Sequence, residues 1–551
     1  MAIPVAKISK TFFWDADSFS CKKLYIFLGL IALAGTFILA DDRPKKNIVV
    51  FVNHDHSVNA WSTFEGTFKE LNPTKNIDNL SDNGSVFLNA FASNGSAAPG
   101  IATMLTGKFA HSHGLLVNGQ KFEPKQESVV RTLKEGGYET AVFGRWNLKT
   151  KPSDFDHWEV LEDSTEFYNP SFISPSGKFQ IEGHSTDIIT DLLMKWIKGR
   201  IGSKKPFLAF ALFNATQRPW MPTLRQLETY NDILLPEPES LYYEQKDLAP
   251  ASRYQQIEIS KDLNLTHDLF IPPFSEIEGT QSISASTYHK NLARMNEEQL
   301  SSWQLLWRPQ NEAYLRGLPQ GEDLLRWKYQ RFAKNYLRCI RDVDDNIERF
   351  RSYFRNSSEE ECILFYTANQ GRFIGENGWF GNQWMMDLSM RVPLLITSIN
   401  GKVKSGHKIE YCVQDIDIAP TILSLSGISR DLPMQGFALN LNDWNSSQVR
   451  KRDALYFHHY EFPGLSMVSS HNGIRTPNHK ILHYYQFGEW EFFDLKKDPS
   501  EQTNVFESNK MFNILKAKLF QIQDELGDNA DKSIMPEKWR RIYRGPSARR
   551  E

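Results

Sequence analysis

Short apolar runs that alternate with helical patterns limit most strongly what this chain can fold into. The run "NIVVFV" at residues 47–52 is β-branched and too short for a helix, which predicts a strand buried on both faces. Similar runs begin at Ala141, Pro206, Cys362 and Val392, and segments such as "ESVVRTLKEGGY", which ends in a Gly pair typical of a helix C-terminus, lie between them. We therefore predict an α/β fold with a mainly parallel sheet sandwiched by helices, and a ligand site at the carboxyl ends of the strands.

The length and the pattern together predict more than one structural unit. A chain of 551 residues exceeds the size at which single hydrophobic cores usually stop growing. Residues 223–321 break the alternation with mixed polar and Pro-containing sequence, and we interpret them as an insertion near the rim of the site. From residue 440 the segments "GIRTPNHKILHYY" and "EWEFFDLKKDP" are typical of antiparallel strands, and a helix is expected at 509–525. Residues 440–551 are thus predicted to form a smaller C-terminal α+β subdomain that ends in a basic tail.

The N-terminus carries an apolar run, residues 24–40, directly after Lys22 and Lys23. A membrane-spanning helix needs roughly 20 apolar residues and a signal peptide needs fewer, so residues 1–40 are predicted to be a signal peptide or an N-terminal membrane anchor. We expect an exported protein, secreted or periplasmic, or one anchored in the membrane through residues 24–40.

The charge and the cysteines exclude other classes of protein. Lys and Arg number 64 against 66 Asp and Glu, so no overall positive field attracts nucleic acid, and membrane contact is expected only through the N-terminal apolar segment. Cys21 precedes the apolar run, which leaves Cys339, Cys362 and Cys412 after it. This odd number argues against a disulfide framework and predicts free, buried thiols.

Seven motifs in order carry a resemblance to a known family. They are "KNIVVFVNHDH", "SAAPGIATMLTG", "TLKEGGYETAVFGRWNL", "KPFLAFALFNATQRPW", "YTANQGRFIGENGWFGNQWMM", "DIDIAPTILSLSGI" and "EFFDLKKDPSEQTN". Over about residues 46–527 the chain resembles the sulfatase family of the alkaline-phosphatase superfamily, most of all the glycan sulfatases that act on N-acetylglucosamine-6-sulfate. The resemblance implies a sulfatase-like N-terminal domain at 46–439. It also implies a formylglycine nucleophile made from Cys or Ser, and a Ca²⁺ ion held by oxygen ligands.

The catalytic positions that the resemblance implies hold other residues here. Aligned on "LTG" at 105–107, the nucleophile position falls on Ala97 and the motif arginine on Ile101. Positions expected to be Lys, His, His and Lys are occupied by Arg145, Asn147, Gln217 and Asn382. A methyl group can neither be oxidised to an aldehyde nor attack an ester. The conventional formylglycine centre is therefore predicted to be lost.

The implied metal positions are His54, Asp55, Asn369 and Gln370, which supply one carboxylate where the family supplies three. Because cation affinity in oxygen sites depends on the charge and number of ligands, we expect no cofactor, and at most weak binding of Ca²⁺ or another divalent metal. His471 and Arg475 lie in a stretch that resembles the C-terminal substrate-binding region and would share one face of a strand. They are predicted to contact a sulfated glycan or sugar, and ordinary surface residues on a strand are the alternative.

Three functions follow. The first is an exported sulfatase-family protein associated with sulfated glycans, a non-catalytic or weakly active pseudosulfatase. The second is an active sulfuric ester hydrolase with a rebuilt nucleophile or metal, for which Ser96 and the "NHDHS" group of His54, Asp55 and His56 are the candidates. The third is a membrane-tethered interaction protein. For Ser96 the expected role is capping of the following helix, and whether the chain is an enzyme stays open.

Overall fold

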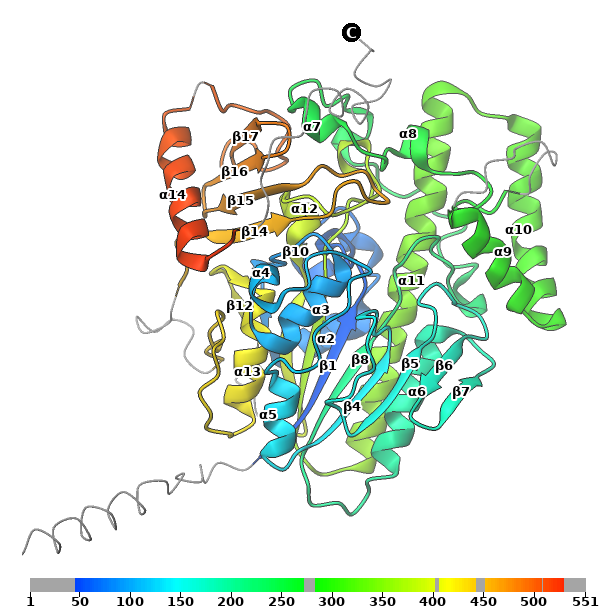
Figure 1. The fold of residues 1–551 in the computed structure, drawn as a ribbon. Coiled ribbons are helices and arrows are strands. Elements are labelled where there is room, and N and C mark those ends of the chain that lie inside the picture. Colours follow the sequence, from blue (N-terminus) through cyan, green and yellow to red (C-terminus); the bar gives the residue numbers. More distant parts are fainter. Residues whose placement is uncertain (1–44, 272–282, 402–405, 442–450, 508, 530–551) are drawn as a thin grey trace, which may run out of the picture. The chain divides into compact units, whose positions relative to one another are not determined.

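The computed structural model describes residues 45–271, 283–401, 406–441, 451–507 and 509–529 (Figure 1). The predicted signal peptide or anchor at 1–40 and the whole basic tail lie outside these residues. In the part of the chain that is described, no helix is both long and apolar enough to cross a membrane.

A ten-stranded sheet forms the centre of the molecule. Its strands, in the order β12-β2-β11-β9-β1-β8-β4-β5-β6-β7, are β12 (His407–Ile409), β2 (Gly84–Phe87), β11 (Leu394–Ile399), β9 (Cys362–Ala368), β1 (Asn47–Asn53), β8 (Phe207–Leu212), β4 (Glu139–Gly144), β5 (His157–Leu161), β6 (Ser171–Ser174) and β7 (Gly177–Gln180). Strands β9, β1, β8, β4 and β5 pair in parallel, whereas β11, β6 and β7 pair antiparallel with their neighbours. The prediction of a mainly parallel sheet is confirmed.

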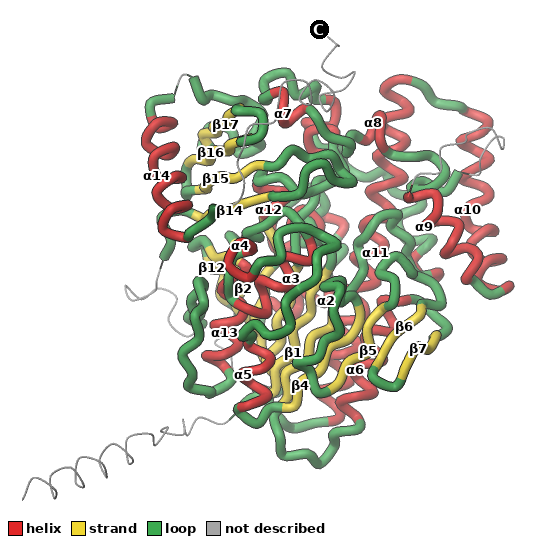
Figure 2. The backbone as a smooth tube through the Cα atoms, in the orientation of Figure 1, coloured by secondary structure: helices red, strands yellow, loops and turns green. Residues whose placement is uncertain are grey.

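Helices cover both faces of this sheet (Figure 2). On β1, Val49 and Phe51 point to a core shared with α2 (Lys75–Ser81), α6 (Ser185–Lys198) and α11 (Gly321–Ser357). The alternate residues Ile48 and Val50 point to a second core with α3 (Ala97–Thr106), α5 (Val129–Glu135) and α13 (Ile418–Leu425). The alternation of side chains along a strand explains why β1 must be apolar throughout.

Shorter elements connect these layers. A small three-stranded sheet is built from β10 (Arg391–Val392), β3 (Ala90–Phe91) and β13 (Val413–Gln414), so the run "VPLLIT" is divided between β10 and β11. The other short helices are α4 (Ala110–His113), α12 (Asp387–Met390), η1 (Val58–Ala60), η2 (Ser62–Phe64), η3 (Lys69–Leu71), η4 (Leu224–Gln226), η5 (Glu239–Tyr242), η6 (Glu376–Gly378) and η7 (Asp415–Asp417).

The predicted insertion contains helices that the sequence pattern did not indicate. They are α7 (Pro250–Arg253), α8 (Ile259–Asp262), α9 (Ile283–Arg294) and α10 (Glu297–Gly317). Helix α10 begins with a capping box between Asn296 and Gln299. Trp303 and Trp307 of α10 pack with Phe270 and Tyr168 in an aromatic cluster, and because Tyr168 precedes the insertion, this cluster joins the insertion to the rest of the chain.

The C-terminal strands and helix are confirmed. Strands β14 (Leu455–His459), β15 (His471–Arg475), β16 (His479–Tyr484) and β17 (Glu489–Asp494) form an antiparallel sheet, and α14 (Met511–Leu526) packs on it through Leu515 and Leu519. This sheet belongs to the same compact unit as the ten-stranded sheet. The boundary at residue 440 stays a prediction.

The three cysteines after the apolar run are free. Cys339 and Cys362 are buried, as predicted, whereas Cys412 is only half-buried.

Candidate functional site

The carboxyl ends of β1, β4 and β9 bring four of the predicted site residues together. Each strand is followed directly by polar residues, namely His54 and Asp55, Arg145, and Asn369. The Asn369 side chain accepts a hydrogen bond from the Asp55 backbone N–H (3.0 Å), and its Nδ2 lies 3.1 Å from His54 Nδ1. Arg145 Nη1 lies 3.1 Å from the same His54 nitrogen. The parallel sheet thus collects three chain segments at one edge, as the topology predicts.

Asp55 is fixed by its backbone as well as by its side chain. Its φ of 58° lies in the left-handed region, which is costly for a residue with a side chain. The Asp55 carbonyl accepts hydrogen bonds from the hydroxyls of Thr216 (3.1 Å) and Tyr336 (2.8 Å). These contacts hold the strained turn in place and direct the carboxylate toward the end of the sheet.

Ala97 is the first residue of α3, and Ser96 is its N-cap residue. The predicted capping role of the Ser96 side chain is wrong, because its hydroxyl makes no cap hydrogen bond. Instead, Ser96 Oγ donates to Glu461 Oε2 (2.9 Å), and Asn118 Nδ2 donates to the same oxygen (3.0 Å). Asn118 Oδ1 accepts from the Ala98 N–H (3.1 Å), so the start of α3 is closed by residues from two distant loops.

The remaining catalytic positions are Asn382, Gln217, Ile101 and Asn147. Asn382 Nδ2 donates to Gln370 Oε1 (2.8 Å), and Gln370 Nε2 donates to the Asn94 carbonyl (3.4 Å), which links these amides to the segment before α3. Gln217 is half-buried, and its Oε1 is buried without a hydrogen-bond partner. Ile101 instead packs in the apolar core between α3 and the sheet. Asn147 follows β4 with a φ of 42° and is half-buried.

Arg372 is a site residue that sequence reasoning missed. Its Nη2 donates to Asp55 Oδ2 (2.5 Å) and its Nη1 to the Phe380 carbonyl (2.6 Å). The side chain is 6% exposed, and the guanidinium carbon lies 5.6 Å from the centre of the Trp220 ring. The sequence does show an arginine directly after "NQG", between the motif positions Gln370 and Asn382. No motif assigns a role to that residue.

Burial dominates the electrostatics of this group. It lowers the pKa of His54 well below its usual value, so the imidazole is neutral at pH 7. It lowers the pKa of Arg145 to about 10, which leaves the guanidinium charged. Burial also raises the pKa of Asp55, and Arg372 acts in the opposite direction. Two guanidinium groups, those of Arg372 and Arg145, therefore act on the one carboxyl group of Asp55.

The donor set does not resemble a metal centre. Among the described residues, no group of three or more His, Cys, Asp or Glu side chains is arranged to hold an ion. His56, a candidate for a rebuilt site, has its Nδ1 2.7 Å from the Tyr366 hydroxyl instead. Burial lowers the pKa of His56 to about 3.

His471 and Arg475 lie on β15 and contact the body of the protein. His471 Nδ1 donates to the Ser469 carbonyl (2.7 Å), and its Nε2 accepts from the Met385 N–H (3.0 Å). Arg475 forms a two-point ion pair with Asp387 at 2.8 Å and 2.8 Å. Both side chains are buried, and their polar groups have protein partners. Their role in binding a sugar stays a prediction.

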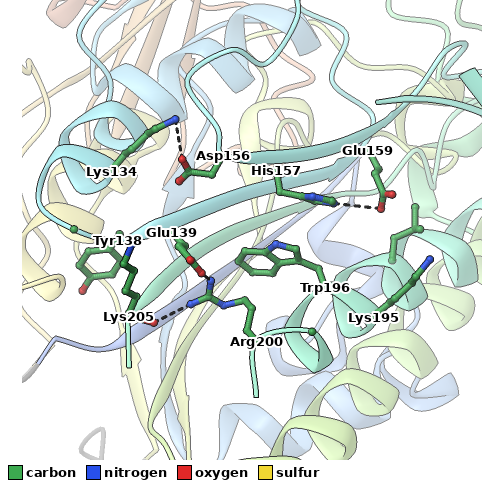
Figure 3. A pocket seen from close by; sticks show the side chains of 13 residues that line it. Lys134, Tyr138, Glu139, Asp156, His157, Glu159, Lys195, Trp196, Arg200 and Lys205 are labelled. Carbon is green, nitrogen blue, oxygen red and sulfur yellow. Dashed lines mark hydrogen bonds and ion pairs between the residues drawn. The ribbon is translucent and has the colours of Figure 1, made fainter. Parts of the chain in front are cut away.

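A groove of about 720 Å³ lies at the opposite edge of the sheet, where β4 and β5 begin (Figure 3). Three pairs of ionisable side chains in it contact each other: Lys134 with Asp156, Arg200 with Glu139, and His157 with Glu159. Ligands of parallel sheets bind at the carboxyl ends of the strands, and this groove is at the amino ends. We therefore place the candidate site at the start of α3 and not in this groove.

Comparison with known proteins finds similarity to sulfatases along most of the chain. The model of the family described as "Sulfatase" matches residues 46–428, and the model described as "N-sulphoglucosamine sulphohydrolase, C-terminal" matches residues 375–527. The N-acetylglucosamine-6-O-sulfatase of Bacteroides thetaiotaomicron is 32% identical over 508 residues, covering 90% of this chain and 89% of the relative. The human N-acetylglucosamine-6-sulfatase is 21% identical over 74% of this chain and 66% of its own length. A solved structure bound to its substrate D-glucosamine-2-N,6-O-disulfate superposes with a TM-score of 0.82 and 31% identity, covering 89% of this chain and 99% of the other.

Proposed function

Because this chain belongs to the sulfatase family, we propose that it is an exported member that binds sulfated or related glycans and has lost the formylglycine and Ca²⁺ centre. One observation carries the proposal. Ala97, at the position that the resemblance gives to the nucleophile, begins α3, and Gln370 donates a hydrogen bond to the Asn94 carbonyl three residues before it. A carbon–hydrogen side chain at this position offers no atom that can attack sulfur.

A sugar is the ligand that best suits the remaining polar groups. Arg145 Nε and Arg372 Nε are donors, and Asp55 Oδ1 and Gln217 Oε1 are acceptors, and all four are buried without a partner. Hydroxyl groups of a sugar both donate and accept hydrogen bonds, and buried polar atoms favour such partners. That a relative's structure holds a disulfated glucosamine supports a sulfated glycan or sugar as the class of ligand.

The test separates binding from hydrolysis. The full chain is incubated with 6-O-sulfated and N-sulfated glucosamines; released inorganic sulfate is measured by ion chromatography, and binding by calorimetry. We expect binding without release, and weaker binding in Gln217→Ala. Sulfate release that disappears in Asp55→Ala would contradict the proposal, because the activity would then belong to this pocket.

An active hydrolase with a rebuilt nucleophile has one observation in its favour. The bond from Ser96 Oγ to Glu461 Oε2 (2.9 Å) has the geometry of a hydroxyl activated by a carboxylate base. If any sulfate release is abolished by both Ser96→Ala and Glu461→Gln, the second function replaces the first.

Export belongs to the same proposal. Lys22, Lys23 and the apolar run at 24–40 support a signal peptide or a retained anchor. Mass spectrometry of the protein from its natural source is expected to find a chain that begins after residue 40, or else a full chain in the membrane fraction. A full-length chain in the soluble cytoplasmic fraction would contradict export.

A further inference from the structure

The single carboxylate at the implied metal positions already has a cationic partner. Asp55 Oδ2 accepts a hydrogen bond from Arg372 Nη2 at 2.5 Å, and His54 Nε2 lies 3.2 Å from the same oxygen. Both ions of the Asp55–Arg372 pair are almost completely buried. A buried carboxylate needs such a partner, because an unpaired charge away from water is very costly.

The backbone holds Arg372 at this place. Gly371, the residue before it, donates its N–H to the Ser389 carbonyl (2.9 Å) and packs closely against the carbonyls of Leu388 and Arg391. The other end of the guanidinium is tied to the Phe380 carbonyl and faces the ring of Trp220. Contacts with other chain segments therefore fix the guanidinium at the carboxylate.

The other implied ligands also have their oxygens engaged. Asn369 Oδ1 accepts the Asp55 N–H (3.0 Å), and Gln370 Oε1 accepts Asn382 Nδ2 (2.8 Å). A Ca²⁺ ion requires roughly six to eight oxygen ligands, usually including several carboxylates. The residues present therefore do not fit the divalent cation that the family implies.

We propose that Arg372 is the permanent counter-ion of Asp55, and that its guanidinium replaces the divalent cation at this site. The positive charge then belongs to the chain itself, so folding and ligand binding do not depend on metal. Arg372 is a positioning residue, since it acts by holding Asp55 and the turn after β1. Like the proposed function, this assignment rests on the loss of the Ca²⁺ centre, but it does not depend on which glycan is bound.

The test asks whether removing Arg372 gives back a metal site. In the double variant Arg372→Ala/Asn369→Asp, two neighbouring carboxylates are present and the guanidinium that pairs with Asp55 is removed. We expect the wild-type full chain to show no calorimetric binding of Ca²⁺ and no change of Tm with Ca²⁺ or EDTA. The double variant is expected to bind Ca²⁺, with a Tm increase of roughly 5 °C at about 100 times its Kd, reversed by EDTA.

Two controls separate this result from nonspecific effects. Arg218→Ala removes another guanidinium, a half-buried one that pairs with the buried Asp268 at 2.5 Å, and is expected to gain no Ca²⁺ binding. Arg372→Lys keeps the charge and is also expected to gain none. If the double variant folds poorly, refolding with millimolar Ca²⁺ against NaCl is the readout, and Ca²⁺ alone is expected to restore the fold.

Two outcomes would overturn the assignment. One is stoichiometric Ca²⁺ binding by the wild-type chain. The other is a double variant that neither binds Ca²⁺ nor refolds with it. The second leaves the proposed function intact, whereas sulfate release by a metal-free wild-type chain would overturn the proposed function and leave the role of Arg372 intact.

Discussion

Gly371 shows how little space the residues around Arg372 allow. A Cβ at this position would lie 2.3 Å from the Leu388 carbonyl oxygen and 2.4 Å from that of Arg391, and both are backbone atoms that cannot rotate away. We expect Gly371→Ala to lower the free energy of unfolding by about 3 kcal/mol, the upper range for overpacking. Urea unfolding measures the change.

The matched control is Gly317→Ala in α10. A Cβ there would meet no atom within 4 Å, and alanine favours the helix, so a small gain in stability is expected. Equal effects of the two variants would show that the turn before Arg372 can relax.

Asn118 is the second residue with a measurable role. Its side chain accepts from the Ala98 N–H and donates to Glu461, so Asn118→Ala leaves both groups without this partner. A loss of about 1 to 2 kcal/mol is expected in thermal unfolding. Asn118→Asp places a second carboxylate beside Glu461 and is expected to be worse than the alanine variant. The reverse order would mean that Glu461 is not held there as a charged group.

At the scale of elements, α2 is joined to α11 by a buried carboxylate. Asp344 of α11 accepts the backbone N–H groups of Asn76 and Ile77 at 3.0 Å and 2.8 Å. Burial raises the pKa of Asp344 to about 7, well above the usual Asp value. The folded state therefore holds a proton that the unfolded state has already lost between about pH 4 and pH 7.

The sign of the pH dependence follows from this raised pKa. The contribution of Asp344 to stability is fully present below about pH 4 and is lost as the pH rises to about 7. Asp344→Asn cannot titrate, so the difference in unfolding free energy between wild type and variant is expected to change by up to about 4 kcal/mol across this range. Urea unfolding at several pH values measures it, and a difference that is independent of pH would contradict the raised pKa.

The elements that follow from hydrophobic periodicity were predictable from the sequence. β1 and α5 are examples, because burial against a sheet dictates their pattern directly. The helices α9 and α10 were not predictable from the sequence. Their apolar side chains pack on a local aromatic cluster, and the segment as a whole has a mixed polar composition. The convergence of Asp55 and Asn369 followed from the parallel topology. The contacts of Arg372 with Asp55 and of Glu461 with Ser96 could not be predicted, because contacts between loops far apart in the sequence leave no periodic pattern in it.

At the scale of the whole molecule, Lys480 joins the C-terminal sheet to the main body. Its ammonium group is fully buried between Asp387, 2.7 Å away, and Glu501, 2.5 Å away. Lys480→Met leaves these carboxylates with less positive charge, so a loss of about 3 to 5 kcal/mol is expected in urea unfolding.

Lys497→Met is the control for that variant. Lys497 is 84% exposed and pairs with Asp494 on the surface, where an ion pair contributes about 0 to 1 kcal/mol. If Lys480→Met lowers the free energy of unfolding no more than this control does, the buried ion pairs of Lys480 do not stabilise the contact between the C-terminal sheet and the main body.

The bond between Ser96 and Glu461 spans 365 positions of the chain. During synthesis the ribosome therefore completes the first strands and α3 long before the loop that closes the start of that helix exists. Until β14 has been made and has folded back, the Ser96 hydroxyl and the Asn118 amide must be satisfied by water. The candidate site is thus assembled among the last parts of the protein, although its first residues are among the earliest to be translated.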